Sequence, residues 1–193
     1  MKTNYLSDYR EAPIKSEQAG YTLIELVVVS GIMVAISGIL AGIFFSTLRG
    51  VETTKTGTAI AQNGNYALNV MSQTIKNANR VTAMTNQAGD ITELDDCTSK
   101  PTGKSISVEL RDGTTVEYAC DFAGGYIASN SASLLDTNTV QLIDDPATCS
   151  FTCIQENSFA VPRVQMQFQL GDKSGKDKNL NELFQTQVYI RNH

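Results

Sequence analysis

The sequence predicts an α+β fold in which one long N-terminal helix packs on an antiparallel β-sheet head. An uncharged apolar run comes first, a stretch with helical spacing of apolar residues follows it, and the remainder alternates between apolar and polar positions. A helix and a sheet that each have one apolar face need a partner to cover that face, so the two are expected to pack together. The 193 residues leave room for one head domain besides the helix.

The first twenty residues, 1–20, are expected to be a leader that is removed rather than part of the fold. They are polar, their charges cancel, and Pro13 interrupts them. Such a segment offers no apolar face to bury.

Residues 21–48 are expected to form the membrane-embedded half of the helix. Leu26 to Leu48 is a run of 23 residues without a charge, which meets the roughly 20 residues needed to cross the hydrocarbon core of a bilayer. A secretory signal peptide would instead have about 7–15 apolar residues behind a basic start. Gly38 and Gly42 weaken this helix, so bending or local melting is expected there, and small residues of this kind also let membrane helices approach closely.

Residues 49–80 are expected to continue the same helix as an amphipathic half that ends near Arg80. Its apolar and small residues recur at spacings of three and four, which is typical of a helix with one buried face. This face comprises Ile60, Gly64, Ala67, Leu68, Met71, Ile75, Ala78 and Thr82.

Residues 81–193 are expected to form the β-rich head. Gly113 lies between two alternating segments and indicates a hairpin in which the glycine has a positive φ. Gly171 to Asn181 is rich in Asp, Lys, Asn and Gly and indicates a loop. The expected strands are 105–110, 114–119, 125–128, 139–143, 151–154, 164–170 and 185–191.

All four cysteines lie beyond the apolar run, where an exported head would meet an oxidising environment, so disulfides are expected. Cys149 and Cys153 would lie roughly 13 Å apart in a strand, too far for a disulfide, so they pair with each other only if a turn separates them. Otherwise they pair with Cys97 and Cys120. Zinc is the rival interpretation, but the spacing lacks C-x2-C pairs.

The junction between leader and helix carries the most specific motif. The segment AGYTLIEL, from Ala19 to Leu26, resembles the prepilin-type signal shared by type IV pilins and type II secretion pseudopilins. That signal has a glycine, an aromatic residue, Thr-Leu-Ile-Glu and a long apolar run, and Tyr21 stands here in place of the more usual phenylalanine. Weaker similarities to minor pilins and J-type minor pseudopilins lie in Asn65 to Val81 and in the terminal FQTQVYIRN.

The resemblance implies a pilin fold, cleavage between Gly20 and Tyr21 by a prepilin peptidase, N-methylation of Tyr21, and assembly into a helical filament. Glu25 and Thr22 are the residues that it assigns to assembly. In the family, the glutamate is thought to meet the terminal amine of the neighbouring subunit and to set the axial register. The implied partners are other pilin or pseudopilin subunits, the peptidase, and a membrane assembly platform with its ATPase.

Physical reasoning about Glu25 agrees with that role. A carboxylate at the head of a membrane helix costs several kcal/mol unless it is paired or neutral, and such residues usually mark function. Within the first turn it gains a little from the helix dipole. The alternative without a functional role is a glutamate that faces headgroup water and has no partner.

No catalytic constellation is expected, and neither is a cofactor. The only histidine is the terminal His193, and no phosphate-binding or dinucleotide-binding glycine motif occurs. A weak calcium candidate consists of Asp177, Asn179 and Asn181, which match the opening of a calcium loop whose continuation fails. The pair Asp144-Asp145 is expected to form a turn rather than a ligand set.

The predicted function is therefore that of a minor structural subunit of a type IV pilus or type II secretion pseudopilus. The alternatives are a major subunit, a filament-displayed adhesin or DNA-uptake receptor, and an unrelated single-span anchored protein. From Arg49 onward the chain carries twelve Lys or Arg against sixteen Asp or Glu, and an acidic head opposes nucleic-acid binding. The expected location is the inner or cytoplasmic membrane with an exported head, followed by an extracellular or periplasmic filament.

Overall fold

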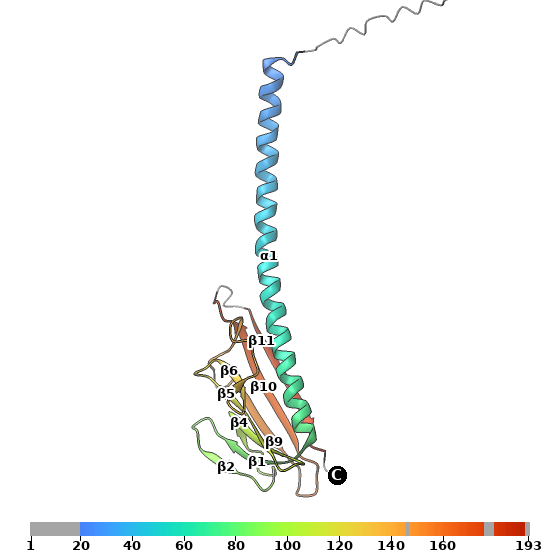
Figure 1. Ribbon diagram of the computed structural model, residues 1–193, viewed down its shortest axis with the longest axis vertical. Coiled ribbons are helices and arrows are strands. Elements are labelled where there is room, and N and C mark those ends of the chain that lie inside the picture. The colour runs from blue at the N-terminus through green and yellow to red at the C-terminus, as the bar shows by residue number, and fades with distance from the viewer. Residues whose placement is uncertain (1–19, 146, 176–179, 192–193) are drawn as a thin grey trace, which may run out of the picture. The chain divides into compact units, whose positions relative to one another are not determined.

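The structure is a computed structural model that describes residues 20–145, 147–175 and 180–191. The chain divides into two compact units, Met1–Leu48 and Arg49–His193. One helix and eleven strands follow one another in these described residues, and every strand pair is antiparallel. The predicted α+β class is confirmed (Figure 1).

The helix α1 spans Leu23–Asn77 and ends three residues before the predicted end at Arg80. Strand β1, Ala78–Thr85, begins there instead, because it pairs with β4. This pairing accompanies the burial of Val81 and Met84. Arg80 lies opposite Glu109 and forms a cross-strand ion pair of 2.9 Å with it. Thr82 is therefore a strand residue and not part of a helical face.

The strands form two sheets rather than the single sheet expected. The first, sheet A, has the order β2-β1-β4-β5-β6-β7, and the second, sheet B, has the order β11-β10-β9-β3, with β8 also paired to β10. Strands β1, β2, β3 and β7 were not expected from the sequence. The bounds are β1 Ala78–Thr85, β2 Ile91–Glu93, β3 Thr102–Gly103, β4 Ser105–Leu110, β5 Thr115–Asp121, β6 Tyr126–Ser129, β7 Ala132–Ser133, β8 Val140–Leu142, β9 Ser150–Ile154, β10 Arg163–Asp172 and β11 Asn181–Tyr189.

All of the expected strands are found, and all but one have shifted ends. The segment 105–110 is a strand with the predicted bounds, and Gly113 in the turn after it has φ of 82° as predicted. Strand β10 continues through Gly171 to Asp172, and β11 begins at Asn181, so the loop predicted from Gly171 to Asn181 is shorter at both ends. Leu170 and Gly171 are buried, because β8 also pairs with this end of β10.

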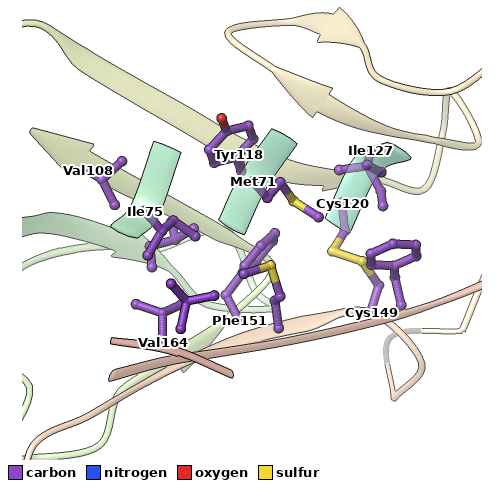
Figure 2. Packing of buried hydrophobic residues seen from close by; sticks show 14 of the residues in the cluster. Met71, Ile75, Val108, Tyr118, Cys120, Ile127, Cys149, Phe151 and Val164 are labelled. Carbon is purple, nitrogen blue, oxygen red and sulfur yellow. A yellow bond between two sulfur atoms is a disulfide. The ribbon is translucent and has the colours of Figure 1, made fainter. Parts of the chain in front are cut away.

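The core lies where the second half of α1 meets the sheets. The residues of α1 that are buried have the predicted spacing of three and four, whereas Leu68 is only partly buried. One cluster joins this face to apolar residues of both sheets, and Figure 2 shows Met71 and Ile75 among them. Figure 1 shows β10 and β11 running beside this part of α1. The buried residues of the helix are Ile60, Gly64, Ala67, Met71 and Ile75.

Candidate functional site

The candidate site is the start of α1, where the predicted cleavage and assembly residues follow one another. Thr22 immediately precedes the helix, and its Oγ1 accepts a hydrogen bond of 3.3 Å from the backbone N–H of Glu25. The carbonyl of Thr22 accepts the N–H of Leu26 at 3.2 Å. A threonine that caps a helix with a glutamate three residues later is the spacing of a capping box. Thr22 therefore fixes where the helix begins.

Gly20 and Tyr21, the described residues before Thr22, are exposed. Gly20 and Tyr21 precede the helix without regular secondary structure, and the side chain of Tyr21 is 84% exposed. A protease acts on an accessible, non-helical peptide, and the peptide bond between these two residues meets that requirement in the described part of the chain. The capped start at Thr22 keeps this peptide bond outside the helix.

Glu25 lies in the first turn of α1 with an exposed side chain. Its backbone N–H is used by Thr22, and no hydrogen bond or ion pair of its carboxylate is found within the described residues. The positive end of the helix dipole stabilises a carboxylate at this position by about 0.3–1 kcal/mol where water is present. The carboxylate is thus placed to accept a cation from outside the chain, and the pairing with a neighbouring amine stays a prediction.

The helix that follows is long and apolar enough to cross a membrane. Its most apolar 18 residues have a mean hydropathy of 2.5, and none of them is buried within the protein. The hydroxyls within this segment bond to helix carbonyls: Ser30 to Val27 at 2.9 Å and Ser37 to Met33 at 2.7 Å. Such bonds would satisfy the hydroxyls in the hydrocarbon core of a bilayer, which offers them no water.

Gly38 and Gly42 lie inside the uninterrupted helix, and a methyl group added at either position would meet nothing within 4 Å. They leave room for another helix to approach, as expected of small residues in membrane helices. Bending or melting at these glycines stays a prediction.

The four cysteines form two disulfides. Cys97 pairs with Cys153, and Cys120 pairs with Cys149, with Cα atoms 5.4 and 6.2 Å apart. The sequence left open whether Cys149 and Cys153 pair with each other, and they do not, because Ser150–Ile154 is a strand and not a turn. The bond from Cys120 in β5 to Cys149, just before β9, links sheet A to sheet B (Figure 2).

The calcium candidate receives no support from the described residues. Asp177 and Asn179 lie outside them, and Asn181 is the first residue of β11. Within residues 20–145, 147–175 and 180–191, no group of three or more His, Cys, Asp or Glu side chains could hold a metal ion. His193 also lies outside the described residues. Of the pair predicted to form a turn, Asp145 begins one, since it accepts bonds from the N–H of Ala147 and from Thr148, whereas Asp144 lies in a bend before it.

The shifted pKa values of the head have structural causes. A hydrogen bond from the Thr98 hydroxyl lowers the pKa of Asp96, and one from the Thr114 hydroxyl lowers that of Asp112. Each threonine lies two residues after its aspartate, so these are local turn contacts.

The capping role of Thr22 is the part of the site that our sequence reasoning missed, although T-x-x-E before an apolar run signals it.

Comparisons with models of protein families, with characterised proteins and with solved structures give no match to this chain.

Proposed function

We propose that this chain is the precursor of a structural subunit of a type IV pilus or type II secretion pseudopilus, and a minor one. After cleavage at Gly20, Tyr21 becomes the methylated N-terminus, the apolar half of α1 holds the subunit in the membrane, and the head is exported. Subunits then leave the bilayer and assemble side by side through their apolar helices.

One observation carries the proposal. Within six residues the chain combines an exposed Gly20-Tyr21 peptide bond, a helix capped at Thr22, and an exposed carboxylate at Glu25, directly before the uncharged run. An unrelated membrane anchor needs the apolar run alone and has no use for a carboxylate at its edge. The two disulfides support an exported head, because disulfides persist in oxidising compartments.

Assembly accounts for the unpaired carboxylate in physical terms. A terminal ammonium moved into a bundle of apolar helices loses its hydration, and it is tolerated there only beside an opposite charge. Glu25 of one subunit and the Tyr21 amine of the next supply such a pair. Each added subunit is then held at the one axial position where both charges are neutralised.

The test is the mass of the N-terminal peptide from the membrane fraction of cells that make the chain with a prepilin peptidase. The expected peptide begins at Tyr21 and carries one extra methyl group. Cells without the peptidase are the matched control and should retain the peptide that begins at Met1. A chain that keeps its first twenty residues in peptidase-containing cells would contradict the proposal.

A further inference from the structure

The outer face of sheet B carries a row of side-chain amides. In strands β10 and β11 successive residues alternate between the core and the outer face, so that Phe168 and Phe184 are buried whereas Gln185 and Gln187 are exposed. Gln165 lies opposite Gln187, Gln167 lies opposite Gln185, and Arg163 lies opposite Tyr189. We name Arg163, Gln165, Gln185, Gln187 and Tyr189 the amide strip.

Two shallow hollows lie along the amide strip. One of about 260 Å³ is lined by Gln165, Gln185, Thr186 and Gln187. The other, of about 220 Å³, has Arg163 and Tyr189 in its wall together with Glu156. Because Arg163 and Gln165 are neighbours on one face of β10, as are Tyr189 and Gln187 on β11, the two hollows adjoin. Arg163 to Gln167 spans about 13 Å of strand, which is room for a short chain-like ligand.

The polar groups of this strip have spare hydrogen-bonding capacity. The amide of Gln187 donates to Gln165 over a long 3.4 Å, which leaves most of the donors and acceptors of both groups unused. A ligand that supplies both donors and acceptors can therefore bond to these amides.

The charge of the strip selects the kind of ligand. The three glutamines are neutral, and the charges of Arg163 and Glu156, which share a hollow, are opposite. The head as a whole is acidic, so it would repel an anionic polymer. A cationic polymer would be attracted more strongly to acidic residues on other parts of the head. A neutral ligand is the one that this strip favours over the rest of the surface.

The chemistry of the strip fits hydroxyl groups. An amide donates and accepts at the same time, as a pair of neighbouring sugar hydroxyls also does. Tyr189 is 56% exposed and offers an amphipathic ring against which the C–H face of a sugar can pack. A peptide strand would instead pair with the backbone of β11, the edge strand of sheet B, and would not need the side chains on this face.

We propose that the amide strip binds a neutral oligosaccharide chain. The hydroxyls of the sugar exchange hydrogen bonds with Gln165, Gln185 and Gln187, and one ring packs on Tyr189. A filament of the kind proposed above would display this strip on its subunits, but binding by the single chain does not depend on that function.

The experiment titrates the full chain in lipid nanodiscs, because sugar-based detergents would compete for the site. Cellohexaose, maltohexaose and hexa-N-acetylchitohexaose are the neutral probes, hexagalacturonate is the anionic comparison, and calorimetry measures Kd. At least one neutral hexasaccharide is expected to bind with a Kd of about 1 mM or tighter, and the anionic one at least tenfold more weakly. Gln165→Ala and Gln187→Ala should each raise Kd about tenfold, the loss expected for one good hydrogen bond.

Gln62→Ala is the matched control, since Gln62 is an exposed glutamine on α1 away from the strip and its replacement should leave Kd unchanged. Thermal unfolding of each variant checks folding, and Tyr189→Ala gives a second route to the same loss if a glutamine variant unfolds. Three results would overturn the proposal. They are the absence of binding by all neutral probes, a Kd that no strip substitution changes, and self-association of the wild-type chain that Gln187→Ala abolishes, which would assign the strip to a second copy.

Discussion

Gly64 on α1 lies directly against the ring of Phe184 on β11, so that a methyl group at position 64 would overlap the ring carbons. The ring cannot move aside freely, because Phe184 is 5% exposed and stacks on Phe168 with ring centroids 5.5 Å apart. The missing side chain at Gly64 therefore lets the helix approach sheet B closely. This close packing offsets the conformational cost of a glycine inside a helix.

Gly64→Ala should destabilise the head by up to about 2 kcal/mol. The alanine gains up to about 1 kcal/mol of helix propensity, but overpacking a filled core costs about 1–3 kcal/mol, and the ring has no free space to enter. Gly57→Ala is the matched control, since a methyl group there meets nothing within 4 Å and should leave the head at least as stable. Near-ultraviolet circular dichroism during heating measures the thermal unfolding midpoints of the two variants. Equal midpoints for the two variants would show that the contact with Phe184 does not restrict position 64.

Reduction should strongly destabilise the head. By the chain-entropy argument, closing loops of 56 and 29 residues is worth about 4 and 3.5 kcal/mol, a large share of the roughly 5–15 kcal/mol of a small domain. Peptide mapping without reductant should find Cys97 joined to Cys153 and Cys120 joined to Cys149. The double variants Cys97→Ala/Cys153→Ala and Cys120→Ala/Cys149→Ala should each lower the unfolding midpoint. Four reactive thiols in the native, unreduced chain would refute the pairing.

Gly20→Glu should block removal of the leader. A glycine lets a protease approach the backbone closely, and a bulky charged side chain at the scissile bond prevents that approach. The full precursor should accumulate in membranes, whereas Gly20→Ala, which adds one methyl group, should still be cut. Immunoblots of membrane fractions compare the two masses. A Gly20→Glu chain processed to the wild-type mass would place the cleavage elsewhere.

Glu25→Val should leave cleavage and membrane insertion intact but reduce entry into filaments. The valine keeps the backbone N–H that Thr22 accepts, so the start of the helix is unchanged, and loss of the carboxylate eases insertion by about 2 kcal/mol or more. What is lost is the partner of a neighbouring Tyr21 amine. Glu25→Gln, which keeps the shape and removes the charge, should behave in the same way.

The measurement for Glu25 is the ratio of subunit in the sheared filament fraction to subunit in membranes. Wild type sets the reference ratio, and both variants should fall well below it at equal membrane levels. If Glu25→Val enters filaments as well as wild type does, the residue is only an interfacial glutamate and the register mechanism is wrong.

Much of the fold could be predicted from residue patterns, because those patterns are local. The uncharged run, the helical face from Ile60 to Ile75 and the alternation in β10 each depend on neighbours within a few residues. The end of α1 could not be predicted in this way. Ala78 fits the helical spacing as well as it fits a strand, and pairing with β4, some thirty residues later, decides the matter.

The sequence by itself determined the apolar helix, the alternating strands, the expectation of disulfides and the motif at Gly20 to Glu25. Only the tertiary structure decided which cysteines pair, that the strands divide into two sheets, and that Arg163, Gln165 and Gln187 share a surface with Tyr189. The physical reason is the range of the interactions. Periodicity and capping act within a turn or a strand, whereas sheet register and disulfide pairing join residues tens of positions apart and depend on how the whole head packs.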